Sequence, residues 1–162
     1  MPDDPKFQQL VDKIKKLQAG KNYDLSLEED LSIAVMNLIS LEEHFFFTSQ
    51  KTGKSDYLDL LQETREIRKS LLAKMIPQHE GETWCITKHL LAATMRLIEV
   101  GTKYQSDGKK AEASTAFTQA YKIYSLFWAV RLKLLNLKGV KKIDKALTIE
   151  DLTTQLIDCC KE

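Results

Sequence analysis

Glycine and proline divide this 162-residue chain into long segments in which apolar residues recur at helical spacing. Five of the six glycines fall between these segments, and the three prolines stand outside them or, for Pro5, in a first turn. Both residues disfavour the interior of a helix, and Ser26 with Glu29 has the spacing of a capping box. The predicted helices span about 4–19, 27–51, 56–76, 82–105, 109–138 and 149–160. No segment alternates in the manner of a strand, so the sequence predicts an all-α fold.

The four central segments are long and joined by short turns. Helices connected in this way pack as antiparallel neighbours. We therefore predict an up-down antiparallel four-helix bundle over about 27–138, with short additional N- and C-terminal helices. The whole chain, 1–162, is expected to form a single helical domain, since a chain of this length buries a core without disulfides or metal.

One stretch, from residue 97 to residue 120, has a more specific spacing of large and small residues. Its pattern consists of Leu97, Val100, Gly101, Tyr104, Gly108, Ala113, Phe117 and Ala120. Small residues stand where two antiparallel helices would cross, and a tight turn is expected at 106–108. The pattern resembles a single tetratricopeptide-repeat hairpin. Repeat arrays need about three copies and we find one, so we interpret the match as hairpin packing that implies no chemistry.

Composition excludes several classes of protein. The formal net charge of +1 creates no global field that would steer the chain toward nucleic acid or a membrane. The acidic, polar start is unlike a signal peptide, and no apolar run approaches the ~20 residues of a membrane span. The cysteines, Cys85 and the pair Cys159–Cys160, are odd in number, which indicates free thiols in a reducing compartment and a cytoplasmic location.

Charged residues interrupt the apolar arcs of three predicted helices. Glu42, Arg68 and Arg131 each fall in the middle of such an arc, and His89 lies at the edge of a fourth. Buried charges need a partner. Glu42 could bridge one or both arginines in a structural network, or the excess positive charge could hold an anion such as a phosphate or carboxylate. A third alternative is that Arg131 reaches the surface past the end of the core.

Other constellations are weaker. Cys85 and His89 are four residues apart and could face one metal ion, but the usual sets of paired cysteines or histidines are absent. We therefore predict no metal site and no cofactor. No spacing supports a catalytic triad or a di-iron centre, which disfavours an enzyme without excluding one.

Charge is also segregated along the chain. Residues 131–145 carry six basic side chains and one acidic one, whereas residues 22–50 carry six acidic side chains and no lysine or arginine. The basic segment could contact nucleic acid or an anionic membrane surface. Pairing with the acidic segment, within the chain or across a dimer, explains it equally well.

The segment 82–105 has two apolar faces, although a bundle helix needs one. The first face comprises Ile86, Leu90, Ala93, Leu97, Val100 and Tyr104, and we predict that it is buried. The second comprises Trp84, Leu91, Met95 and Ile98. That second stripe must be covered by a terminal helix or by another molecule.

The sequence therefore favours a non-catalytic helical interaction or scaffold protein that self-associates or binds a protein partner through the stripe on 84–98. An alternative is a small-molecule-binding bundle in which Arg68 and Arg131 hold an anion and Glu42 and His89 orient it. A further alternative is a nucleic-acid-associated protein that uses the basic segment 131–145.

Overall fold

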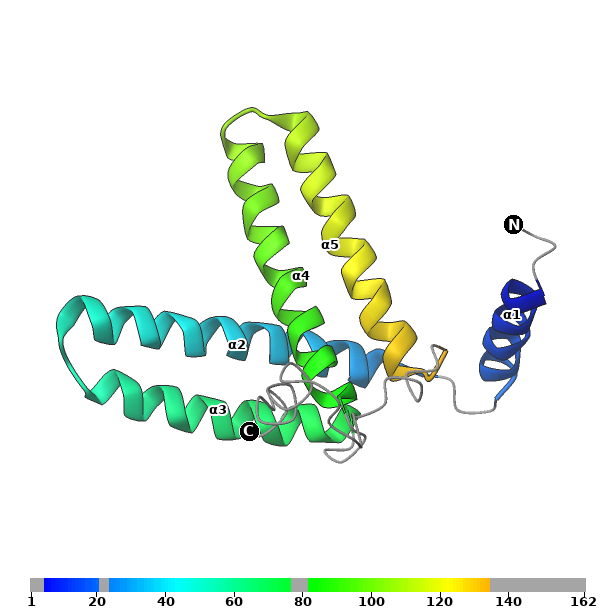
Figure 1. The fold of residues 1–162 in the computed structure, drawn as a ribbon, viewed down its shortest axis with the longest axis horizontal. Helices are drawn as coiled ribbons and strands as arrows, with labels where there is room; N and C mark the ends of the chain where they lie inside the picture. The colour runs from blue at the N-terminus through cyan, green and yellow to red at the C-terminus, as the bar shows by residue number, and fades with distance from the viewer. Residues whose placement is uncertain (1–4, 21–23, 77–81, 135–162) are drawn as a thin grey trace, which may run out of the picture.

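The computed structural model describes residues 5–20, 24–76 and 82–134, and within these ranges the chain forms five helices and no strand. The helices are α1 (Pro5–Gln18), α2 (Ser26–Thr52), α3 (Asp56–Met75), α4 (Thr83–Ser106) and α5 (Lys110–Arg131) (Figure 1). The all-α prediction is confirmed, and the bounds of α1 to α4 agree with the predicted ones to within one residue. The predicted helix over 149–160 and the pair Cys159–Cys160 lie outside the described residues.

Helix α5 ends at Arg131, well before the predicted end near residue 138. The chain leaves the helix through Lys133, whose φ of 55° is left-handed. The Lys133 N–H donates to the carbonyl of Val130 (3.0 Å) and the Leu134 N–H donates to that of Ala129 (2.9 Å). This bonding pattern is a Schellman motif, which usually contains glycine. A lysine in that place gave no sequence signal for the helix end.

The start of α2 also differs from the capping prediction. Ser26 is the first helical residue rather than the cap. Its backbone N–H donates to Oδ1 of Asp24 over 2.9 Å. This hydrogen bond from the Ser26 backbone lowers the pKa of Asp24, because it stabilises the charged carboxylate. Asp24 therefore satisfies a free N–H of the first turn, as a capping side chain does.

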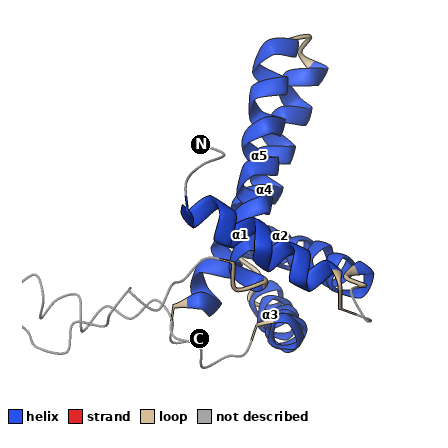
Figure 2. Cartoon of the chain, turned by 90° about the vertical axis from the view of Figure 1, so that its right-hand side faces the viewer, coloured by secondary structure: helices blue, strands red, loops and turns tan. Residues whose placement is uncertain are grey.

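The helices pair into two hairpins. Helices α2 and α3 form the first hairpin, and α4 and α5 form the second. The two hairpins cross steeply rather than lie side by side, and they meet mainly through α2 and α4 (Figure 1). Figure 2 shows the second hairpin rising away from the first, with α3 seen end on. The up-down four-helix bundle is therefore not confirmed.

The core lies at the crossing. It contains Val35, Met36, Leu72, Met75, Ile76, Trp84, Cys85, Leu91 and Phe127. These residues come from the first half of α2, the end of α3, the start of α4 and the end of α5. The two hairpin tips consequently project beyond the shared core.

Polar contacts between α2 and the second hairpin accompany this core. They are Glu28 with Arg131 (2.7 Å), Ser32 with Tyr124 (2.7 Å) and Glu43 with Arg96 (2.6 Å). The α2 members follow one another at whole numbers of helical turns, so they mark the side of α2 that faces the second hairpin. Tyr124 also stacks on Phe127 of the core, with ring centroids 5.7 Å apart.

Within the second hairpin, α4 and α5 approach closely at a glycine. A Cβ atom at Gly101 would lie 2.5 Å from the Cε1 atom of Phe117. The alanines that α5 buries against α4 are Ala113, Ala116 and Ala120. Small side chains are therefore required at this crossing, as the spacing of 97–120 predicts. Gly108 makes the turn with a left-handed φ of 75°.

We expect Gly101→Ala to destabilise the protein by about 1–3 kcal/mol, because the overlap with Phe117 outweighs the roughly 1 kcal/mol gain in helix propensity. In a Phe117→Ala background the overlap is gone, and the same substitution should stabilise. Urea denaturation of the four proteins measures both effects. A stabilising Gly101→Ala in the otherwise unchanged chain would contradict the close approach.

Candidate functional site

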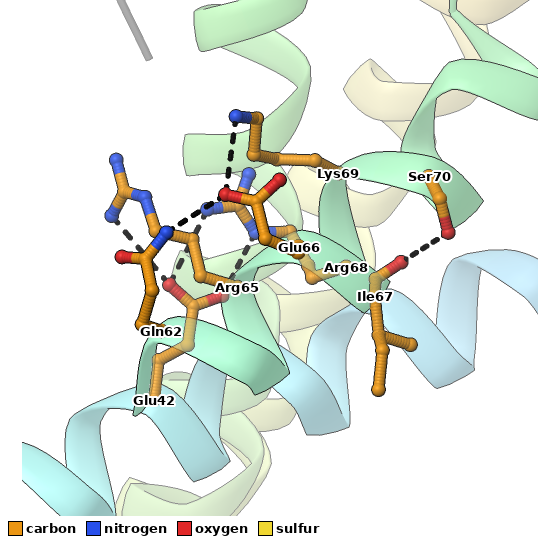
Figure 3. A network of polar contacts seen from close by, with 8 residues as sticks. All are labelled: Glu42, Gln62, Arg65, Glu66, Ile67, Arg68, Lys69 and Ser70. Atoms are coloured by element: carbon orange, nitrogen blue, oxygen red, sulfur yellow. Dashed lines mark hydrogen bonds and ion pairs between the residues drawn. The ribbon is translucent and has the colours of Figure 1, made fainter. Parts of the chain in front are cut away.

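The most buried charge among the described residues is Arg68 of α3, whose side chain is 1% exposed. Its Nε donates to Oε1 of Glu42 on α2 over 2.8 Å, and its Nη2 donates to Oε2 of the same carboxylate over 3.3 Å. Arg65, one turn earlier, has its Nη1 3.7 Å from Oε2 (Figure 3). One carboxylate thus accepts a bidentate pair from Arg68 and lies close to a second guanidinium.

The other two residues of the predicted anion site lie elsewhere. Arg131 at the end of α5 donates from Nη2 to Oε1 of Glu28 over 2.7 Å. Glu28 and Glu42 are separated by about 21 Å along α2, since a helix rises about 1.5 Å per residue. His89 is exposed on α4. The structure therefore unites Glu42 with Arg68 and does not bring Arg131 and His89 to them.

The ion pair at Arg131 forms a less complete hydrogen-bonding arrangement than the one at Arg68. The Nε atom of Arg131 and the Oε2 atom of Glu28 are buried without a hydrogen-bond partner among the described residues. Both side chains are about a quarter exposed, so the pair lies at the rim of the core. Exposed or rim ion pairs contribute little to stability, typically about 0–1 kcal/mol.

Sequence reasoning missed Glu28 as a partner. Glu28 precedes Glu42 by 14 residues, which is close to four helical turns, so both carboxylates lie on nearly the same side of α2. This spacing of 14 residues was the signal in the sequence that Glu28, like Glu42, could face another helix. Glu28 lies in the first turn of α2, and only the crossing of the hairpins places α5 beside it.

The candidate metal ligands are separated by burial. Cys85 lies in the core, whereas His89 is exposed. In the parts of the chain that the structure describes, no three His, Cys, Asp or Glu side chains form a group that could hold a metal ion.

None of the helices described there is long and apolar enough to cross a membrane.

The predicted interface stripe on α4 lies mostly inside the molecule. Trp84 and Leu91 are buried in the core, and Met95 packs against it. Ile98, beyond the crossing, remains 38% exposed. The stripe is therefore covered largely by the chain's own hairpins, and Ile98 is its one exposed member.

Much of the opposite face of α4, which was predicted to be buried, is left open beyond Leu90, which packs against the core. None of its members is buried, and Val100, which follows Leu91 by nine residues and so lies about half a turn around the helix, is 40% exposed. The most deeply buried face of α4 is the one with Trp84 and Leu91, so the prediction that the face with Val100 and Tyr104 is the buried one was wrong. The first hairpin approaches α4 from the side of Trp84 and Leu91, a direction that the sequence does not encode locally.

This uncovered face forms one wall of an open groove of about 410 Å³, which we call the outer groove. Its lining consists of Leu97, Val100 and Tyr104 from α4 and Ala111, Glu112, Thr115, Ala116 and Gln119 from α5. Glu112 is the one charged residue in this lining. The outer groove is thus a shallow, largely uncharged channel between two helices.

Comparison with protein-family models, curated proteins and solved structures finds no match to this chain. The function is therefore inferred from the geometry of the chain itself.

The Glu42–Arg68 ion pair leads to a prediction about the free energy of unfolding. Glu42→Ala should cost about 3–5 kcal/mol, because it leaves the buried guanidinium of Arg68 without that carboxylate. Arg68→Met should cost less, since Glu42 retains Arg65 nearby. The double variant Glu42→Met/Arg68→Met should recover most of the loss. Chemical denaturation measures all three.

An anion site would behave differently. Phosphate should then raise the melting temperature of the unchanged protein, and Arg68→Met should abolish that increase. We expect no such increase in melting temperature, because Arg68 is already paired with Glu42 and Arg131 with Glu28.

Proposed function

We propose that this chain is a non-catalytic helical interaction protein that self-associates through the outer groove. The observation that carries the proposal is the pair of apolar faces on α4, of which the fold buries one and leaves the C-terminal part of the other open. The face with Trp84 and Leu91 forms the core, and the face with Leu97, Val100 and Tyr104 stays open. An apolar helix face left in this way is typical of a surface that binds another helix.

A second copy is the partner that the groove suits best. Two copies related by a twofold axis would present the same groove to each other, so that Val100 of one lies near Val100 of the other. Their α4–α5 hairpins would then form an antiparallel four-helix bundle between chains, which is the arrangement the sequence predicts within one chain. Hairpins of the kind that residues 97–120 resemble also bury their faces by stacking on neighbours.

The alternatives have less support. In the anion-binding alternative, Arg68 and Arg131 hold a ligand, but each donates to a glutamate. In the nucleic-acid alternative, the basic segment 131–145 makes the contact, and the structure describes only its first four residues. The odd number of cysteines supports placing the interaction in the cytoplasm, as part of the same proposal.

Two substitutions on α4 test the proposal with a matched control. Val100 and Ile98 are 40% and 38% exposed, but they lie on different sides of the helix. Val100→Glu would bury a carboxylate in the self-association surface, and we expect it to raise the dissociation constant at least tenfold. Ile98→Glu should leave association unchanged. Native mass spectrometry and sedimentation velocity measure the oligomeric state.

A monomeric unchanged protein at tens of micromolar would contradict self-association. Dissociation by Ile98→Glu alone would instead assign the interface to the Trp84–Ile98 side of α4. Circular dichroism spectra that match the unchanged protein establish that each variant is folded.

A further inference from the structure

The first hairpin has a second uncovered apolar surface, on the side away from α4 and α5. Leu27 and Leu41 of α2 are 70% and 39% exposed, and Ile67 of α3 is 54% exposed. Leu38 of α2 and Leu71 of α3, which share this side, are half-buried. We call the surface made by these five residues the back face.

The contacts of α2 establish where the back face points. Glu43 bonds Arg96 of the second hairpin, and Leu41 precedes Glu43 by two residues, so Leu41 points about 160° away from it. Glu42 pairs with Arg68, and the residues that precede these two are Leu41 and Ile67. In an antiparallel pair of helices, residues that precede directly paired positions emerge on the same side. Leu41 and Ile67 therefore share one face.

We propose that the back face is the docking surface for α1 of the same chain. Helix α1 is the most strongly amphipathic of the five described helices. In the sequence, apolar residues stand at positions 7, 10, 11, 14 and 17, the spacing of one helical stripe. Yet α1 packs extensively on none of the other described helices, and Figure 1 shows it apart from both hairpins. An isolated helix of 14 residues is marginal in water, so α1 needs a surface to pack on.

The lengths of α1 and of the connection to α2 fit the back face. Helix α1 has 14 residues and is about 21 Å long, which equals the distance along α2 from Leu27 to Leu41. Gln18 and Ser26 are eight residues apart, a connection that spans at most about 26 Å and favours an antiparallel neighbour. Docked in this way, α1 would end beside Leu27 and begin beside Leu41.

Hydrogen–deuterium exchange of the full-length chain tests the proposal, with the amides of α1 as the readout. We expect protection of α1 that Ile67→Asp reduces at least tenfold. Leu27→Asp, at a more exposed position, should act in the same direction. Val100→Glu in the outer groove is the matched control and should leave α1 unchanged. Val100 belongs to the proposed self-association surface and Ile67 to the back face. The two variants therefore distinguish failure of α1 docking from failure of self-association.

Three outcomes would overturn the proposal. The first is exchange of α1 at the rate of an unstructured peptide. The second is protection that depends on Val100 rather than on Ile67, which would place α1 in the outer groove. The third is protection that disappears on dilution, which would show that α1 docks on a second copy.

Discussion

The contact between α2 and α4 is the interaction on which the rest of the structure depends. Two-helix hairpins bury little surface on their own, because each helix has a partner on one side only. The large side chains of Trp84, Leu91 and Phe127 are fully buried only where the hairpins cross. The first half of α2, with Val35 and Met36, supplies the opposing surface.

The direction of this crossing decides which surfaces remain uncovered. Four helices packed side by side would cover two sides of each helix along its whole length. Crossed hairpins share a core over part of their length and leave their outer faces open. The outer groove on the second hairpin and the back face of the first are both consequences of this geometry.

The buried ion pair has a structural explanation. Arg68 crosses from α3 to Glu42 on α2 within the first hairpin, so it aligns the two helices at the edge of the core. An arginine and a carboxylate in bidentate contact have a preferred geometry, which a pair of apolar side chains lacks. The pair therefore favours one register of α3 against α2, as buried polar groups do in some helical assemblies.

The sequence by itself determined the helices. Apolar spacing and the positions of glycine and proline determined the bounds of α1 to α4, because these signals act within a few residues. The exception is the end of α5 at Arg131, which is followed by a left-handed lysine, Lys133, that carries no such signal. Gly101 and the small residues of α5, such as Ala113 and Ala120, also indicated the close packing of the second hairpin. The sequence further identified Glu42 and Arg68 as charges that require partners.

Only the tertiary structure decided which partners and faces were used. Two apolar faces on α4 are equivalent in a local pattern, and the approach of the first hairpin covers the one with Trp84 and leaves the one with Val100 open. Arg131 pairs with Glu28 rather than with Glu42 because the crossing brings the end of α5 to the start of α2. Such contacts join residues about 100 positions apart, and their geometry depends on the packing of the whole core, which no local spacing contains.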